Sequence, residues 1–444
     1  MQFTVQLEGG PRRVNHAAVL LGDFIYSFGG YCSNENPPAD SPIDIHALNT
    51  VSYRWERIRA INEKNLSEES SSRRPAYSNE VDDDEDSASD YSDALEVNDE
   101  EAEMESDGEM EEMGEDEDET QRNEDVPYQR YGHTVVAYRG KAYLWGGRND
   151  EFGASSLLHE FDPRTRRWTV LRVSGMIPPA RDGHSAVVHG NKMFLFGGFE
   201  EELQRFSQET YVFDFDTNAW AELFTFGEKP MWRDFHTAVA IDGIMYVFGG
   251  RSDQMGPFHS TRDVYDSTLR VLDLRTRKWS ELATSGEVPG GRRSHSAWTF
   301  NGRMYIFGGF FGTQQQHFND LFSFDPMTRI WKKEKPSGPE PCVRRRQCTV
   351  EVNGRVFLFG GTMPTVPASA NSTQQQQPGL SDLDDLYVLD YSPSLYHLSA
   401  RAVIGSRILT RYLYALPRDI RIDLEMMTKK NSISCNGRAR GAAG

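Results

Sequence analysis

The chain has 444 residues, of which 38% are hydrophobic, enough for one large domain or two or three small ones. It contains no apolar run of about 18 residues, so we expect no membrane-spanning helix and no membrane partner. The N-terminal MQFTVQLEGG lacks the basic-then-apolar order of a secretory signal. The four cysteines show no CxxC and no metal-ligand spacing. They predict free thiols in a reducing compartment, cytoplasmic and/or nuclear, with neither a metal nor a cofactor.

The net charge of -19 comes from one segment. Residues 61–125 hold 28 acidic and 4 basic side chains, whereas the rest of the chain holds 39 acidic and 44 basic ones. A segment so charged and so poor in aromatic residues cannot bury a core. We therefore predict a disordered acidic insertion over 61–126, between parts of a mildly basic folded domain.

Outside this segment, the predicted elements recur in units of about 50 residues. A glycine pair ends two short apolar runs that read as a β-hairpin; the pairs begin at Gly29, Gly146, Gly197, Gly249, Gly308 and Gly360. The first spacing is 117 residues and the others are 51 to 59, so removing the acidic insertion makes it regular. A third apolar run and a tryptophan strand close five units. Four strands repeated six times predict a six-bladed β-propeller over 1–60 and 127–392.

The sixth unit lacks its tryptophan strand. The N-terminal FTVQLEGGPRRVNHAA aligns with WTVLRVSGMIPPARDGHSA, which includes such a strand. We therefore expect Phe3 to Leu7 to form the outer strand of the last blade. This closure joins the two ends of the ring and removes an open sheet edge.

Two polar residues repeat with the blades. A histidine stands 13 residues before the glycine pair in five blades, and Gln347 replaces it in the sixth. Such regularity favours packing or hydrogen bonding within each blade over chemistry. An arginine stands three residues earlier in all six blades, from Arg13 to Arg344. It favours a tie from a loop to the neighbouring blade, with a ring of cations around the channel mouth as the alternative.

Other arginines occur only in particular blades and are more informative about function. A hairpin returns the chain to the side that it left, so the loops before the first strand and after the glycine pair share one face. That face carries Arg148, Arg251, Arg293, Arg345 and Arg346, with Tyr31, Phe199, Phe310 and Trp232 nearby. Convergent guanidinium groups and aromatic walls suit a carboxylate or phosphate ligand. The alternative is a solvated basic rim.

No catalytic motif is present: GxSxG, HExxH and GxxxxGK[ST] are all missing from the sequence. No RNA- or DNA-binding motif is present either, so we do not expect a nucleic-acid partner. The sequence predicts a non-catalytic binding protein.

Beyond Tyr391 the pattern changes to helical spacing of apolar residues. We predict a helical tail over 393–428 and a disordered C-terminus over 429–444. The apolar side of such a tail either packs beneath the propeller or holds a partner.

The glycine pair, the downstream aromatic residue and the tryptophan resemble the kelch repeat. In the tail, SLYHLSARAV resembles the BC box that binds elongin C, through Leu395, Ser399 (where the family usually has Cys) and Val403. LPRDIRIDL resembles the cullin-2 box, through Leu416, Pro417, Ile420 and Leu424. In this order and after a kelch propeller, the motifs are similar to those of kelch substrate receptors of cullin-2 ubiquitin ligases.

The resemblance implies a substrate-recognition subunit of a cullin-2 RING ligase, with elongin B/C and cullin-2 with its RING subunit as partners. It implies substrates that end in glycine, with Arg251 and Arg293 holding the terminal carboxylate and Phe199 forming an aromatic wall. Ser294 stands beside Arg293, which occupies the position of a serine contact in relatives. The alternative is a non-catalytic kelch scaffold for cytoskeletal or chromatin proteins.

Two hypotheses concern self-control. The acidic insertion leaves from the arginine-bearing face, where it would attract basic substrate tails or screen the pocket, or serve as an inert tether. The given sequence ends in GRARGAAG, so Gly444 could enter the chain's own pocket or that of a neighbour.

Overall fold

A computed structural model describes residues 1–61, 125–365, 379–406 and 413–433. Residues 1–61 and 124–444 form one compact unit, and 62–123 form a second that lies outside the described residues. Nearly all of the predicted acidic insertion therefore also lies outside them. No helix in the described ranges is long and apolar enough to cross a membrane.

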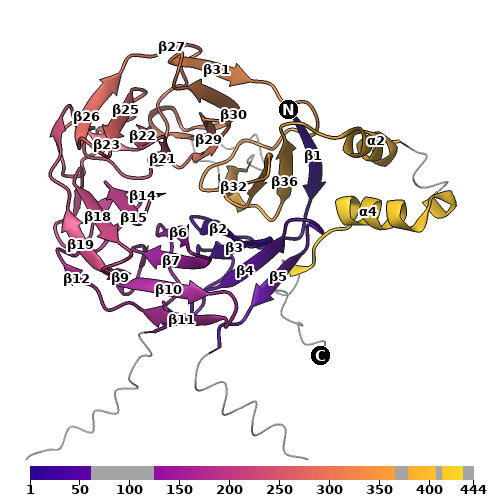
Figure 1. Cartoon of the computed structure of the whole chain (residues 1–444), viewed down its shortest axis with the longest axis horizontal. Coiled ribbons are helices and arrows are strands. Elements are labelled where there is room, and N and C mark those ends of the chain that lie inside the picture. The colour runs from indigo at the N-terminus through magenta and orange to yellow at the C-terminus, as the bar shows by residue number, and fades with distance from the viewer. Residues whose placement is uncertain (62–124, 366–378, 407–412, 434–444) are drawn as a thin grey trace, which may run out of the picture. The chain divides into compact units, whose positions relative to one another are not determined.

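Six four-stranded antiparallel sheets follow one another around the first unit (Figure 1). The strands of blades one to three are β2 (Ala17–Leu21), β3 (Phe24–Phe28), β4 (Ile45–Asn49) and β5 (Trp55–Ile58); β6 (Thr134–Tyr138), β7 (Lys141–Trp145), β10 (Leu158–Asp162) and β11 (Arg167–Val170); and β14 (Ser185–His189), β15 (Lys192–Phe196), β18 (Thr210–Asp214) and β19 (Ala219–Glu222).

Those of blades four to six are β21 (Thr237–Ile241), β22 (Ile244–Phe248), β25 (Leu269–Asp273) and β26 (Lys278–Leu282); β28 (Ser296–Phe300), β29 (Arg303–Phe311), β30 (Gln316–Asp325) and β31 (Ile330–Glu334); and β32 (Cys348–Val352), β33 (Arg355–Phe359), β36 (Leu386–Asp390) and β1 (Gln2–Leu7). The predicted six-bladed kelch propeller is confirmed. Its predicted closure is also present, because β1 pairs antiparallel with β36, with Leu7 opposite Leu386.

Shorter elements decorate the blades. Three two-residue strands pair in parallel with the outer strand of the next blade: β12 (Ser174–Gly175), β20 (Phe226–Gly227) and β27 (Ser285–Gly286). Other short strands follow the glycine pairs or precede the histidines: β8 (Arg148–Asn149), β9 (Gly153–Ala154), β13 (Arg181–Asp182), β16 (Phe199–Glu200), β17 (Arg205–Phe206), β23 (Ser252–Asp253), β24 (Asp263–Val264), β34 (Thr362–Pro364) and β35 (Leu380–Asp382). A 3-10 turn, η1 (Gly312–Gln314), caps the long β29–β30 hairpin.

Each glycine pair sits where two blades meet. Both glycines have positive φ, for example +71° at Gly146 and +79° at Gly147. A Cβ on Gly146 would lie 2.5 Å from Cε1 of His184 in the next blade, and one on Gly147 would lie 2.6 Å from Cβ of His133 in its own blade. Only glycine satisfies both the backbone conformation and the close approach.

The repeated histidines connect blades, which corrects the expectation of bonding within a blade. His133 Nε2 lies 3.1 Å from the carbonyl of Phe28 in the preceding blade, and His184 Nε2 lies 2.8 Å from the Thr134 hydroxyl. Burial lowers the pKa of His133 to about 3, so the ring is neutral at physiological pH. The histidines are part of the joint between blades.

The repeated arginines also differ from expectation. The guanidinium bonds within its own blade: Arg181 Nη1 donates to Gly197 O (3.1 Å) and to Ser207 Oγ (2.7 Å). The backbone carbonyl of the same residue makes the link to the preceding blade, by accepting from Gly147 N at 2.9 Å. The side chains are buried, and four of the six pair with an aspartate in their own blade: Arg13, Arg233, Arg292 and Arg344. These arginines therefore have a structural role and do not form a ring of cations around the channel mouth.

The residue before each histidine position adopts the left-handed conformation, and six such residues close a ring of backbone hydrogen bonds. Each N–H donates to the carbonyl of the equivalent residue in the preceding blade at 2.7–3.2 Å. The members are Asn15, Gly132, Gly183, Phe235, Ser294 and Arg346. With the histidine positions they line a central cavity of about 110 Å³.

The tail packs where the first and last blades meet. It holds α2 (Leu395–Ile404), η2 (Leu413–Ala415) and α4 (Arg418–Thr428), which lie beside β1 (Figure 1). Ser394 accepts from His397 N as the N-cap of α2. Ala400, Leu424 and Met427 join a buried cluster with Val5 and Trp55.

The C-terminal segment predicted to be disordered, 429–444, is ordered at its start. Asn431 N donates to Glu8 O (2.8 Å) and Ile433 N donates to Gly9 O (3.0 Å). The Asn431 amide bonds to Tyr53 O (3.2 Å) and Trp55 N (3.0 Å). These paired backbone and side-chain bonds hold 429–433 against both β1 and β5; residues 434–444, including Gly444, lie outside the described ranges.

Candidate functional site: an arginine-rich propeller face

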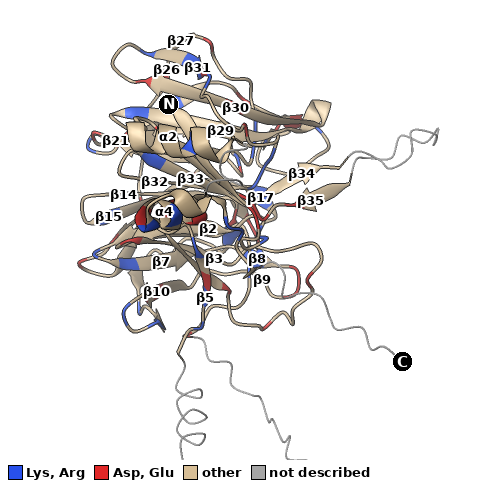
Figure 2. Cartoon of the chain, turned by 90° about the vertical axis from the view of Figure 1, so that its right-hand side faces the viewer, with Lys and Arg blue, Asp and Glu red and all other residues tan. Residues whose placement is uncertain are grey.

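The loops before the first strands and after the glycine pairs lie together on one face. There, the residue after each glycine pair exchanges backbone hydrogen bonds with the residue two before the histidine position. Figure 2 shows β8, β9, β17, β34 and β35 on this side of the propeller. The bridged pairs are Val14–Tyr31, Tyr131–Arg148, Asp182–Phe199, Asp234–Arg251, Arg293–Phe310 and Arg345–Thr362. We call this surface the ligand face.

Arg251 is bound by an acid that the sequence prediction missed. Its Nε and Nη2 contact the two carboxylate oxygens of Asp234, at 3.2 and 2.5 Å. Asp234 is fully buried. This bidentate pair holds the guanidinium rigidly and neutralises much of its charge, so Arg251 cannot supply a free cation as the prediction assumed.

Arg293 and Arg345 carry charge that no neighbouring acid neutralises. Their guanidinium carbons lie 5.5 Å and 4.2 Å from the ring centre of Phe310. In the described part of the chain, no carboxylate lies within 4 Å of either guanidinium, and Nε of Arg345 is buried without a hydrogen-bond partner. Phe310 therefore supports two cations whose donors remain available.

Arg346, a member of the ring of backbone hydrogen bonds, is a further arginine on this face. Its Nη1 donates to the hydroxyl of Tyr31, and its guanidinium carbon lies 5.9 Å from the Phe235 ring centre. Its Nε is buried without a partner among the described residues. Arg293, Arg345 and Arg346 together form what we call the arginine cluster.

The electrostatics of the arginine cluster favour an incoming anion. Burial, together with repulsion from Arg346 and Arg293, lowers the pKa of Arg345 to about 10. Burial also lowers the pKa of Arg293, with Arg251 and Arg346 adding to the effect. Charged groups that destabilise one another gain when a carboxylate arrives between them.

The remaining predicted residues surround the cluster at different distances. Phe199 packs edge-on against Phe206, and the Arg251 guanidinium lies 5.1 Å from that Phe206 ring. Arg148 lies 3.5 Å from the carboxylate of Glu201. Ser294 is buried in the backbone ring. Trp232 is half-buried beside Gln208. In the orientation of the Gln208 amide that satisfies both of its polar atoms, its oxygen accepts from Trp232 Nε1 at 2.9 Å and its nitrogen donates to Pro230 O at 3.2 Å.

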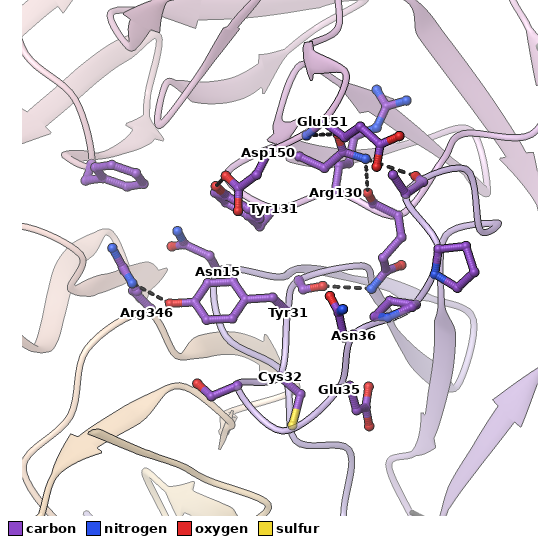
Figure 3. Close-up of a pocket in the computed structure, with 18 residues that line it drawn as sticks. Asn15, Tyr31, Cys32, Glu35, Asn36, Arg130, Tyr131, Asp150, Glu151 and Arg346 are labelled. Carbon is purple, nitrogen blue, oxygen red and sulfur yellow. Dashed lines mark hydrogen bonds between the residues drawn. The ribbon is translucent and has the colours of Figure 1, made fainter. Parts of the chain in front are cut away.

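A cavity of about 720 Å³ on this face opens beside the cluster (Figure 3). Tyr31 and Tyr131 stand edge to face on its floor, with ring centres 5.3 Å apart. Arg346 lies beside the Tyr31 hydroxyl, and Asp150 lies beside the Tyr131 hydroxyl, which donates to it at 2.6 Å. An extended chain whose end contacts the arginine cluster has room here for the residues that precede it.

Comparison with known proteins agrees with this architecture. The model of the KLHDC2/KLHL20/DRC7 Kelch-repeats domain matches residues 132–361. The chain is 40% identical over 434 residues to kelch domain-containing protein 3 of Bos taurus, with 98% of each chain covered, and the same holds for that of Homo sapiens. The chain belongs to the kelch domain-containing protein 3 family. More distantly, it is 29% identical over 253 residues to host cell factor 2 of Homo sapiens, covering 54% of this chain and 31% of that one.

In this kelch protein the tail exposes only part of the predicted partner surface. Leu395 is 82% exposed and Ser399, four residues on along α2, is also exposed. Val403 is half-buried against the propeller. An exposed leucine at the start of an amphipathic helix is suited to a partner's apolar groove.

The predicted cullin-contacting residues lie mainly inward. Leu424 is 2% exposed, and Leu416 and Ile420 pack against the same buried cluster. Pro417 is exposed at the N-terminus of α4. Leu424 therefore anchors α4 to the propeller and is not free to contact a partner, a correction that follows from the apolar seam between β1 and β5.

Within the described residues, no group of three or more His, Cys, Asp or Glu side chains could hold a metal ion. The chain is a kelch-repeat protein.

Proposed function

We propose that this kelch protein is the substrate-recognition subunit of a cullin-2 RING ubiquitin ligase, and that it binds proteins through a C-terminal glycine. The observation that carries the proposal is the arginine cluster: three guanidinium groups at one mouth with no acid of their own among the described residues. A chain terminus differs from any internal peptide by one full negative charge. A terminal glycine lets that charge approach closely, since it has no Cβ.

The ion pair of Arg251 supports a different position for the carboxylate than the sequence predicted. Asp234 already occupies two donors of Arg251, so the terminal carboxylate is better served by Arg293 and Arg345, with Arg251 as a fixed neighbour. The chain before the terminus would run into the cavity beside Tyr31 and Tyr131. The receptor itself carries out no bond chemistry.

Peptides ending in Gly, in Ala and in glycine amide test the proposal. We expect binding of the free glycine terminus and about tenfold or greater loss with the amide, since a charged hydrogen bond contributes roughly 1.5–3 kcal/mol. Arg345→Ala should weaken binding without lowering the unfolding midpoint. Arg251→Ala should lower the midpoint, because it leaves Asp234 buried without its partner. Equal binding of the acid and the amide would contradict the proposal.

The ligase assignment is tested separately, through the exposed side of α2. Leu395→Ser should abolish capture of purified elongin B/C, because it removes the exposed apolar anchor. Met327→Ser is the matched control, since Met327 is a 92% exposed apolar residue in a β-turn of blade five. Failure of the wild type to capture elongin B/C would leave a kelch-repeat protein that binds other partners, such as the cytoskeletal or chromatin proteins of the scaffold alternative.

A further inference from the structure

One buried acid on the ligand face has no partner of its own. Asp182 lies in β13, two residues before His184, and is 6% exposed. Within the described residues its carboxylate makes no side-chain hydrogen bond and no ion pair, and its oxygens keep a small contact with solvent. Glycine 132 of the preceding blade packs directly against it: a Cβ there would lie 3.1 Å from Asp182 Oδ2. A buried carboxylate in such a place is costly in its ionised form.

The charges that face Asp182 come from three blades. Asp234, fully buried, faces it from blade four; Glu201 comes from its own blade; and Tyr131 contributes a phenol from blade two. The two nearby cations are already engaged. Arg251 is held by both oxygens of Asp234, and Arg148 lies 3.5 Å from Glu201. Three acids thus share two arginines, and Asp182 is the acid left over.

Its protonation equilibrium reflects this arrangement. Burial and the charges of Asp234 and Glu201 outweigh the opposing effect of Arg148 and Arg251, and together they raise the pKa of Asp182 to about 7. The group therefore changes its charge near physiological pH.

We propose that Asp182 is a proton-linked switch on the ligand face: its protonated form favours binding of an anionic peptide terminus, and its ionised form opposes it. The inference rests on the proposed carboxylate-binding function. Because Asp234 and Glu201 already offset Arg251 and Arg148, ionised Asp182 adds an uncompensated negative charge to the ligand face, and this charge opposes an incoming carboxylate. Protonation removes that negative charge without moving any backbone.

The coupling is reciprocal. If protonation of Asp182 tightens carboxylate binding, then a bound carboxylate raises the proton affinity of Asp182 by the same factor, which raises its pKa. The sign for folding follows as well. The pKa of Asp182 is higher in the folded state than in the unfolded chain, so protonation of this group favours folding. This contribution to the free energy of unfolding is lost as pH rises from about 4 to about 7.

Asp182→Asn tests the switch, because the amide has the same shape and cannot ionise. The probe is a labelled peptide that ends in a free glycine carboxylate, titrated from pH 5.5 to 8.5, with the amidated peptide to show any background. We expect wild-type affinity to rise about threefold or more as pH falls through 7. The variant should bind equally at all these pH values, at the level that the wild type reaches at low pH. Glu202→Gln, which removes an exposed acid from the same blade, should keep the wild-type pH dependence.

Thermal unfolding provides a readout that needs no peptide. The unfolding midpoint of Asp182→Asn should equal that of the wild type at about pH 4, and should exceed it by an amount that grows up to about pH 7. A difference that does not change with pH would overturn the inference. A pH-dependent difference in midpoint together with a flat binding curve would also overturn it, since Asp182 would titrate without controlling the site. If neither protein bound the peptide at any pH, the proposed function would fail, and the unfolding data would still report whether Asp182 titrates.

Discussion

At the scale of single residues, the contact between neighbouring blades depends on glycines that cannot be replaced by a residue with a side chain. The first glycine of each pair faces the next histidine and the carbonyl of the next repeated arginine: a Cβ on Gly146 would lie 2.8 Å from Arg181 O as well as 2.5 Å from the His184 ring. Backbone and a buried ring cannot both withdraw, because the same carbonyl accepts the hydrogen bond from Gly147 N. The repeat therefore marks a packing requirement, which explains why it recurs in blades with different ligand-face residues.

Gly146→Ala and Gly140→Ala separate this packing from backbone strain. Both glycines have positive φ, +71° and +79°, but nothing lies within 4 Å of a Cβ at Gly140. We expect each variant to lose about 1–2 kcal/mol from the left-handed conformation, and Gly146→Ala to lose a further ~1–3 kcal/mol from overpacking. Chemical denaturation measures both. Equal losses would mean that the joint can open to admit a methyl group.

At the scale of elements, the C-terminal tail bridges the junction between the first and last blades; we call these contacts the clasp. Residues 429–433 bond to the end of β1 through Glu8 and Gly9, and to the start of β5 through Asn431. Arg54 donates to the carbonyls of Glu425 and Met426, at the C-terminal end of α4. A Cβ at Gly9 would lie 1.9 Å from Asn431 O. First blade, last blade and tail therefore meet in one set of contacts.

Removing the Asn431 side chain tests the clasp. Asn431→Ala leaves Trp55 N and Tyr53 O without their side-chain partner, and we expect a loss of about 1–3 kcal/mol in the free energy of unfolding. Ser432→Ala changes an exposed neighbour and should have no measurable effect. Hydrogen exchange should show faster exchange of α4 amides in Asn431→Ala alone. Unchanged exchange in α4 would mean that Leu424 and Met427 suffice to hold the helix.

At the scale of the whole molecule, residues 1–61 and 124–444 form one compact unit, which residues 62–123 interrupt in the sequence. We expect replacement of 62–123 by a short Gly/Ser linker to leave the thermal unfolding midpoint unchanged, because no blade loses a strand. Peptide affinity at low and high salt then reports whether the segment's charge acts on the ligand face. A midpoint lowered by several degrees would show that the insertion contributes to the fold.

Periodic features of the sequence predicted most of the fold. The glycine pairs, tryptophan strands and FTVQL alignment predicted six blades and their closure by β1, because each blade repeats the same local contacts. Pairings that break the repeat could not be predicted in this way. Asp234 and Arg251 are 17 residues apart and meet only through the bridge between their loops. A sequence signal existed nonetheless, since the position two before the histidine holds Asp182 and Asp234 in successive blades.

The closed ring of six backbone hydrogen bonds makes the loops of the ligand face interchangeable. Its bonds involve only main-chain atoms of Asn15, Gly132, Gly183, Phe235, Ser294 and Arg346, so the aperture keeps its width whichever side chains surround it. Ligand specificity can therefore be changed by grafting one loop at a time, without further changes in the propeller scaffold. The same closed ring means that blades can be added or removed only as complete repeats. Each repeat brings one donor and one acceptor, and a partial repeat would leave the ring of hydrogen bonds open.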